Sequence, residues 1–386
     1  MSKFSAAASR TVAVHVSCAA CVFNTVSSTT IIATAAAEPR DSARLMLFRR
    51  DTDAVEHLRI RDLPTLKLFG DGDLMLVNQT RVLPAFLQGT RAATGGHITG
   101  LYLGHTSPKV SAAETSSNTW RVMLESGGKL QPGERITLDD HASLTLTTRE
   151  GGGRWLAELE ADGSTLAILQ RVGATPLPPY IRKQRKMHGQ SEIADTDAER
   201  YNTVFALDRD HAHSVAAPTA GLHFTPGLLT QLADQGVARS AVELHVGAGT
   251  FAPVRVDDLD EHQMHAEHLA VPADTVRSIR ETRERDGRIL AVGTTTVRAT
   301  ESLPADLASA AEGYAADTRL FIHPDSGFTF RFTDALLTNF HLPRSTLLAM
   351  VASLPGVGIG QLQDLYRQAI AQRYRFYSYG DAMLIV

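Results

Sequence analysis

The chain has 386 residues, 43% of them hydrophobic and 21% charged, and its formal net charge is −4 at pH 7. This composition is that of an ordinary globular protein and excludes a fibrous or disordered chain, and the length predicts two domains. The negative net charge argues against a polycationic nucleic-acid coat, although a local basic patch can still bind RNA.

The first 37 residues form an atypical leader, which contains no Asp or Glu and is rich in Ala, Ser, Thr and Val. A disordered segment, a targeting leader and a misassigned start all fit this composition. Both cysteines, Cys18 and Cys21, lie here. We therefore expect no disulfide framework or cysteine-bound zinc in the folded body, as suits a cytoplasmic protein. The chain has no run of about 18 apolar residues, so we expect no membrane span.

The residues after the leader predict an α/β main domain interrupted by a small all-β domain. Residues 38–81 contain strand-like runs, and 82–171 contain short β-like runs separated by Gly, Pro and Asp turns, which predict a compact barrel or sandwich. From 172 to 386 strands alternate with helices. We therefore expect a discontinuous catalytic domain, 38–81 with 172–386, and an inserted β-barrel at 82–171.

A basic stretch at 175–189 follows the predicted insertion. It joins an extended proline segment to an aromatic residue and four cations. Cationic clusters bind RNA phosphates and aromatic rings stack on unpaired bases, whereas a solvated interdomain linker would have a similar sequence. The candidate RNA contacts are Tyr180, Arg182, Lys183, Arg185 and Lys186.

Two turn-rich segments, 214–224 and 243–251, resemble parts of a binding site more than core strands. Each is a short apolar run that breaks into small residues and presents a histidine, His223 or His245. Glycines allow tight turns and close approach of a ligand to the backbone, and threonines supply donors and acceptors. The candidate ligand contacts are Thr219, Gly221, Gly247, Gly249 and Thr250.

Two later segments also predict site residues. A buried strand at 289–292 precedes Gly293 and three threonines, and then continues as a helix that carries Arg298. Such a turn can hold a phosphate or carboxylate, although a plain threonine N-cap is the alternative. Residues 338–342 are expected to form a loop before Pro343, which would open the next helix. The candidate residues are Thr294, Thr295, Thr296, Arg298, Asn339 and His341.

Two other motifs are discounted. HQMHAEH at 262–268 contains three histidines but lacks the HExxH arrangement, so we expect no metal. GVGIG at 356–360 lies between predicted helices rather than after a strand, which indicates a helix–helix turn and not a dinucleotide site. The chain ends in an aromatic segment with Asp381 and a terminal strand, which we expect to be buried.

Beyond the leader, the sequence resembles the S-adenosylmethionine:tRNA ribosyltransferase-isomerase family of queuosine biosynthesis over 38–386. The segments that carry this resemblance are EPRDSARL, LVNQTRVLPA, PLPPYI, RYNTVFA, APTAGLHFT, ELHVGAGTFAPV, HQMHAEH, GRILAVGTTTVRATES, DALLTNFHLPRSTLL and RFYSYGDAMLI. The chain departs from the family at Ala248 and Ala252, where larger residues are common, and in lacking the usual acidic opening.

The resemblance implies a fold, a reaction and its partners. The fold would be an α/β domain interrupted by a β-barrel. The enzyme would move the ribosyl part of S-adenosylmethionine onto the aminomethyl group of a 7-deazaguanine in the tRNA anticodon, leaving epoxyqueuosine and releasing adenine and methionine. S-adenosylmethionine would be a co-substrate, with no other cofactor. We expect a monomer, with the 175–189 cluster contacting tRNA.

The chemistry of such a transfer suggests roles for the candidate residues. A sulfonium acidifies the neighbouring C5′ proton, so a positioned base can remove it and start the loss of adenine. His223 and His245 are the candidate bases because histidine titrates near neutral pH, with Glu243 as an orienting or alternative carboxylate. The candidate donors to the leaving adenine are a protonated Asp381, His341 and Asn339. The 294–296 turn and Arg298 would hold the methionine carboxylate or a phosphate.

Two other functions remain open. The chain could be an RNA-binding homologue that has lost catalysis, for which the altered leader is an argument. It could instead be a transferase that acts on a free nucleoside or base, which would suit the negative net charge.

Overall fold

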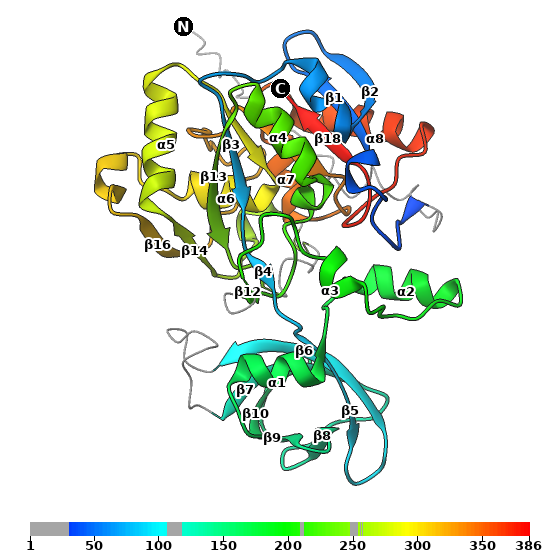
Figure 1. Ribbon diagram of the computed structural model, residues 1–386. Helices are drawn as coiled ribbons and strands as arrows, with labels where there is room; N and C mark the ends of the chain where they lie inside the picture. Colours follow the sequence, from blue (N-terminus) through cyan, green and yellow to red (C-terminus); the bar gives the residue numbers. More distant parts are fainter. Residues whose placement is uncertain (1–30, 106–117, 209–211, 248–253, 255, 257) are drawn as a thin grey trace, which may run out of the picture.

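Two sheets dominate the structure, an open sheet in an α/β body and a closed barrel beneath it in the view of Figure 1. The computed structural model describes residues 31–105, 118–208, 212–247, 254, 256 and 258–386. The combination confirms the expected fold class, an α/β main domain with a small all-β barrel.

The open sheet has nine strands within the described residues. They are β1 (Arg44–Arg49), β2 (Ala54–Arg59), β3 (Leu74–Asn78), β13 (Ala238–Leu244), β14 (Glu267–Val271), β15 (Ile289–Val292), β16 (Tyr314–Thr318), β17 (Ala335–Asn339) and β18 (Ala382–Ile385). Their spatial order is β16-β14-β13-β3-β15-β17-β18-β1-β2. The four central strands β13, β3, β15 and β17 run parallel to one another.

The sequence places these strands in the centre because their side chains are apolar on both faces. All residues of β3, β15, β17 and β18 are buried, as is typical of strands that helices cover on both sides. The helices of the body are α4 (Pro226–Asp234), α5 (Ala273–Glu284), α6 (Thr294–Glu301), α7 (Thr346–Ala352) and α8 (Gly358–Ala371). The predicted strand and helix on either side of Gly293 are confirmed as β15 and α6.

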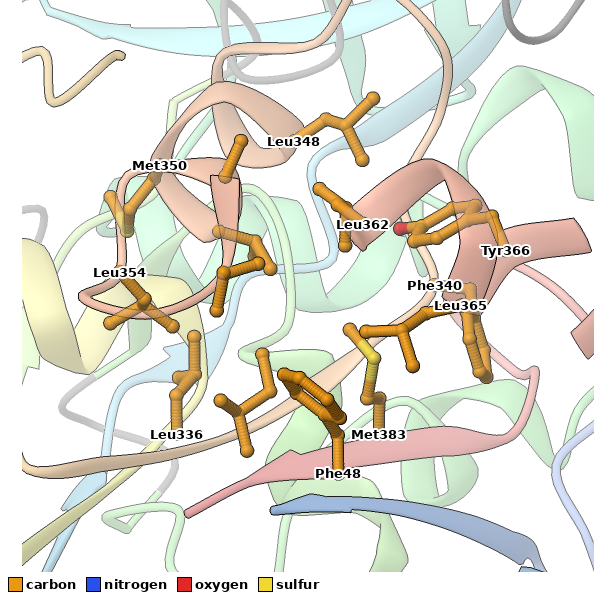
Figure 2. Packing of buried hydrophobic residues seen from close by; sticks show 14 of the residues in the cluster. Phe48, Leu336, Phe340, Leu348, Met350, Leu354, Leu362, Leu365, Tyr366 and Met383 are labelled. Carbon is orange, nitrogen blue, oxygen red and sulfur yellow. The ribbon is translucent and has the colours of Figure 1, made fainter. Parts of the chain in front are cut away.

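Two apolar layers hold these helices to the sheet. Figure 2 shows one of them, in which Phe48, Leu336 and Met383 of the sheet pack against side chains of the α7–α8 region. On the other face, neighbouring sheet residues pack with α4 and with the 3₁₀ helix η4 (Ile60–Leu66). Shorter 3₁₀ turns are η3 (Arg40–Ser42), η6 (Thr219–His223), η8 (Leu259–Glu261) and η9 (Leu307–Ala310).

The second sheet closes into a six-strand barrel. Its strands are β5 (Phe86–Arg91), β6 (His97–His105), β7 (Thr119–Ser126), β8 (Arg135–Asp139), β9 (Ala142–Gly151) and β10 (Arg154–Glu160). They pair in the order β5-β6-β7-β10-β9-β8, and β8 pairs back to β5. Alternate residues of β7 and β10 are buried, so each strand sends one set of side chains inward around Trp120 and Trp155.

A short helix and strand join the barrel to the body. Helix α1 (Thr165–Val172) contributes Leu166 and Leu169 to the barrel core, and β11 (Gly173–Ala174) pairs with β5. Helices α2 (Pro179–Met187) and α3 (Asp197–Arg200) follow between the two units (Figure 1), and β4 (Arg81–Val82) pairs with β12 (Ala212–Ser214).

Replacing Gly173 by alanine should destabilise the protein. The added Cβ would lie 1.8 Å from the carbonyl oxygen of Pro84 and 2.6 Å from that of Leu169. Both are main-chain atoms, so the clash is relieved only if β11 or α1 shifts, and such overpacking costs about 1–3 kcal/mol. Urea titration should show this loss of unfolding free energy. The control is Gly127→Ala, where nothing lies within 4 Å of the added Cβ; equal stability of the two variants would contradict the prediction.

The described end of the leader, residues 31–37, contacts the α/β body. The Phe376 N–H donates to the Ile31 carbonyl, Ile32 forms a bridge with Phe376, and Ala33 is buried among body residues. Residues 31–37 pack because they are apolar and lie beside the C-terminal segment. Cys18 and Cys21 lie outside the described residues, and no described helix is both long and apolar enough to cross a membrane.

Candidate functional site

The carboxyl ends of the central parallel strands meet at one edge of the sheet. There β13 is followed by His245, β15 by Gly293 and β17 by Phe340. In open α/β sheets, ligands bind in the crevice outside this edge, where loops from neighbouring strands separate. Three of the predicted site motifs therefore converge at this edge, whereas the 214–224 motif reaches it after β12 of the two-stranded sheet.

A pocket lies at this edge, between the turn of η6, the start of α6 and the segments after β17 and before β18. Six of the predicted residues line it, namely Thr219, Thr294, Thr295, Asn339, His341 and Tyr180. The cavity volume is about 80 Å³, whereas pockets for drug-sized ligands usually measure about 300–1,000 Å³.

Two buried polar atoms in the pocket wall lack a hydrogen-bond partner among the described residues. They are Oδ1 of Asn339 and Oγ1 of Thr295. A buried polar group without a partner destabilises a protein by about 1–3 kcal/mol. Their retention beside a cavity indicates a ligand that supplies the missing hydrogen bonds.

The other amide atom of Asn339 is fixed by its surroundings. Nδ2 donates to the Tyr377 carbonyl at 3.1 Å and lies 3.3 Å from Nε2 of His223. Burial lowers the pKa of His223 to about 4, against a smaller raising effect of Asp381, so its imidazole is neutral near pH 7. His223 does not line the pocket but lies behind Asn339, where it holds the amide.

His341 is the predicted histidine that lines the pocket itself. Its Nε2 lies 2.8 Å from Oγ1 of Thr338, and its backbone N–H donates to the hydroxyl of Tyr366 at 2.7 Å. Burial lowers the pKa of His341 to about 4. A neutral, held imidazole therefore borders the cavity.

The expected loop at 338–342 is only partly a loop. Thr338 and Asn339 belong to β17, because the apolar run before them continues the buried strand. Pro343 does not open a helix, since α7 begins at Thr346 with Ser345 as the N-cap. The Ser345 side chain accepts from the Leu348 N–H, so this serine starts the helix in place of the proline.

The start of α6 divides the predicted anion-binding residues into two groups. Thr294 and Thr295 line the pocket. The Thr296 hydroxyl instead donates to the carbonyl of Val292, the last residue of β15, and the Arg298 guanidinium forms a buried ion pair with Glu267. Arg298 is thus engaged in the core, although its buried Nη2 has no hydrogen-bond partner among the described residues, so its contact with a ligand carboxylate stays a prediction.

Of the described part of the second histidine segment, residues 243–247, Val246 alone lines the pocket. His245 Nε2 is 3.5 Å from a carboxylate oxygen of Glu243, and the His245 ring packs against His268. The Gly247 N–H donates to Glu267 at 3.1 Å. The predicted contacts Gly249 and Thr250 lie outside the described residues.

Two further predicted site residues, Gly221 and Asp381, have structural contacts. Gly221 does not line the pocket; a Cβ there would lie 2.8 Å from Cγ2 of Thr203, so the glycine is required for packing. Asp381 is buried, and its carboxylate accepts hydrogen bonds from Arg44 N–H and from the main chain and guanidinium of Arg375. Its oxygens thus accept hydrogen bonds from structural donors, and its role as a donor to adenine stays a prediction.

The basic cluster lies on helix α2 rather than on an extended segment. Most of its cations face carboxylates: Arg185 is buried against Asp197, and Arg182 and Lys186 lie within 4 Å of Glu192. Lys183 is exposed. Tyr180 belongs to the pocket, where its hydroxyl lies 2.6 Å from Oγ of Ser378 and burial raises its pKa to about 12.

Sequence reasoning missed several pocket residues. They are Thr338, Ser345, Tyr377 and Ser378. Tyr377 adopts φ 70°, a strained backbone conformation for a bulky residue. The only sequence signal is their position next to motifs already singled out. Among the described residues, which include the 262–268 histidines, no group of three or more His, Cys, Asp or Glu residues is arranged to hold a metal ion.

Comparison with known proteins places this geometry in context. A family model described as queuosine biosynthesis protein matches residues 23–385. The S-adenosylmethionine:tRNA ribosyltransferase-isomerase of Thermotoga maritima is 41% identical over 356 residues, covering 92% of this chain and 96% of the relative. That of Symbiobacterium thermophilum is 42% identical over 360 residues, with coverage of 92% and 96%. A crystal structure of S-adenosylmethionine tRNA ribosyltransferase from Thermotoga maritima covers 92% of this chain and 96% of its own, with 32% identity and a TM-score of 0.48.

Proposed function

The chain belongs to the queuosine biosynthesis protein family, and from this premise we propose how it acts as an S-adenosylmethionine:tRNA ribosyltransferase-isomerase. It transfers and isomerises the ribosyl moiety of S-adenosylmethionine onto 7-aminomethyl-7-deazaguanine in the tRNA anticodon. Epoxyqueuosine remains in the RNA, and adenine and methionine are released.

One observation supports this site above all others, the pair of buried polar atoms that the protein leaves without partners. Asn339 Oδ1 and Thr295 Oγ1 stand in the wall of one pocket at the carboxyl edge of the sheet. An amide and a hydroxyl suit a purine-like ring, which carries donors and acceptors on its edge. Both adenine and 7-deazaguanine have such an edge.

We assign the proton-transfer role to His341, because its neutral imidazole lines the cavity while His223 lies behind Asn339. His341 would accept the C5′ proton that the sulfonium acidifies, which starts the loss of adenine. The incoming aminomethyl group must then attack as the neutral amine. In this scheme His223 is a positioning residue for Asn339.

The methionine part of S-adenosylmethionine would lie at the start of α6. Thr294 and Thr295 line the pocket there, and the free N–H groups at a helix N-terminus favour a carboxylate. His245 with Glu243 remains the alternative base: Glu243 lies on β13 and His245 directly follows this strand, at the same edge of the sheet. The proposal uses S-adenosylmethionine as co-substrate and requires no other cofactor.

The proposal also covers the organisation of the chain. Residues 38–81 and 172–386 would form the catalytic unit and 82–171 the inserted unit, which is supported by the sheet that β3 shares with β13 and β15. We propose that the enzyme works as a monomer. The reaction would take place in the cytoplasm, where tRNA is available.

Nucleoside analysis of tRNA incubated with the protein and S-adenosylmethionine tests the function. Epoxyqueuosine in RNA that carried the 7-aminomethyl-7-deazaguanine precursor is the expected product. RNA binding without product would favour the RNA-binding alternative. Product formed only from the free base or nucleoside would favour the other transferase.

A further inference from the structure

A second cavity, of about 390 Å³, lies where β1 begins and β2 ends. Three arginines and one histidine line it, against a single carboxylate, and the residues are Arg44, His57, Leu58, Arg59, Arg61 and Asp62. We name this feature the β1–β2 basic pocket. None of the roles proposed above involves the β1–β2 basic pocket.

The sheet places two of these positive charges opposite each other. Arg44 and Arg59 are directly paired in the antiparallel register of β1 and β2. Like charges in such a cross-strand pair destabilise a sheet. The arrangement therefore favours an anion that lies between or above the two guanidiniums.

The contacts of these arginines hold them without neutralising them. The Arg44 guanidinium lies 3.9 Å above the Tyr374 ring and donates to the Gln372 carbonyl. Arg59 donates to the Ser42 carbonyl at 2.6 Å, and Arg61 is exposed. Throughout the described part of the chain, no carboxylate lies within 4.0 Å of the Arg44, Arg59 or Arg61 guanidinium.

The single carboxylate of the pocket has another function. Asp62 accepts the backbone N–H of Arg59 at 2.8 Å, at the start of η4. It thus caps the 3₁₀ helix that presents Arg61. The contrast with α2 is clear, because there Arg185 is paired with buried Asp197 and two other cations face Glu192.

The β1–β2 basic pocket opens at the same edge of the sheet as the Asn339 pocket. Asn339 pairs with Ala382 on β18, and Ala382 pairs with Leu45 on β1. Arg44 is the next residue, and its N–H donates to Asp381 at 3.1 Å. Two strand spacings of about 4.8 Å each separate the chains that carry Asn339 and Arg44, roughly 10 Å in all.

We propose that the β1–β2 basic pocket binds backbone phosphates of the tRNA beside the nucleotide that enters the Asn339 pocket. Arg44 and Arg59 form the held base of this contact, and Arg61 reaches out to the RNA. The proposal rests on the proposed function, which makes tRNA the substrate. In this proposal the main positively charged surface that contacts tRNA is the β1–β2 side of the body and not helix α2.

Charge reversal at Arg61 tests the surface, because its side chain has no described structural contact to lose. The probe is an unmodified in vitro tRNA transcript, with Kd measured by fluorescence anisotropy over a series of KCl concentrations. Arg61→Glu should raise Kd about 10-fold and reduce the slope of log K against log salt by about 1. In steady-state assays, KM for tRNA should rise by a larger factor than kcat falls.

The matched control is Arg285→Glu, which changes the net charge equally at an exposed position after α5. Its Kd and salt slope should equal those of the wild type. A second variant, Arg59→Gln/Arg61→Gln, removes charge without reversing it and should weaken binding in the same direction. Thermal melting of each variant checks the fold.

The outcomes separate this inference from the proposed function. Arg61→Glu with the Kd and salt slope of Arg285→Glu would overturn the docking surface, whether or not the enzyme forms epoxyqueuosine. Weaker binding by Arg61→Glu would support the surface even if the wild type formed no product, in which case the proposed function alone would fail.

Discussion

Replacing His341 by alanine is expected to lower kcat about 10²- to 10⁴-fold, the usual contribution of a positioned general base. His341 borders the cavity, with Nε2 2.8 Å from Oγ1 of Thr338 and its main chain fixed by Tyr366. The variant cannot accept the C5′ proton, so loss of adenine should become rate-limiting. Release of adenine and formation of epoxyqueuosine, followed over time, measure the change.

The matched control is His97→Gln, at an exposed histidine on the barrel strand β6, which should leave kcat unchanged. A His341→Ala enzyme that turns over within about threefold of the wild type would remove His341 from this role and favour the His245–Glu243 pair.

The pH profile gives an independent check of the same assignment. A base works only when unprotonated, and burial lowers the pKa of His341 to about 4. The acid limb of kcat should therefore fall as pH approaches 4, rather than near 6.5 as for an exposed histidine. An acid limb of kcat near pH 6.5 would contradict the role of His341 as the general base.

Arg298→Met is expected to destabilise the protein by about 3–5 kcal/mol, because it removes the cation from a buried ion pair. The side chains of Arg298 and Glu267 are only 4% and 5% exposed. Arg298 also donates to the Leu320 carbonyl, and Glu267 accepts the Gly247 N–H, so the pair links α6 to segments at two strand ends. Urea denaturation monitored by circular dichroism measures the loss.

Two further variants test this explanation. In the double variant Arg298→Met/Glu267→Gln, the Glu267 charge that Arg298→Met leaves without its cation is also removed. Part of the lost free energy of unfolding should therefore return. Arg277→Met removes an exposed ion pair with Asp274 on α5 and should behave like the wild type. If the double variant is no more stable than Arg298→Met, the effect arises from packing rather than from the buried charge.

The barrel and the α/β body could be predicted because each leaves a local trace. Alternate burial along β7 and β10 follows the two-residue period of a strand, and the apolar runs of β15 and β18 indicate strands covered on both faces. The predicted start of the loop at 338 was wrong. The polar residues Thr338 and Asn339 resemble a loop in the sequence, although tertiary packing buries them.

Part of the candidate site could be predicted because its residues end or follow a central strand. Asn339 ends β17, and Thr294 lies just after β15. The partners of charges cannot be read from the chain, since Glu267 and Asp197 lie 31 and 12 positions from Arg298 and Arg185. The β1–β2 basic pocket was missed for a related reason: only the register of two strands brings Arg44 and Arg59 together.

The pairing of β1 with β18 has a consequence for biosynthesis. Phe48 pairs with Ile385, so the ribosome must add roughly 340 residues before β1 gains this neighbour, or roughly 20–70 s at 5–20 residues per second. The barrel strands lie close together in the chain and can close much earlier. A nascent chain can therefore close its barrel while the apolar strand β1 still lacks its β18 neighbour, and transiently exposed apolar surface of this kind favours aggregation.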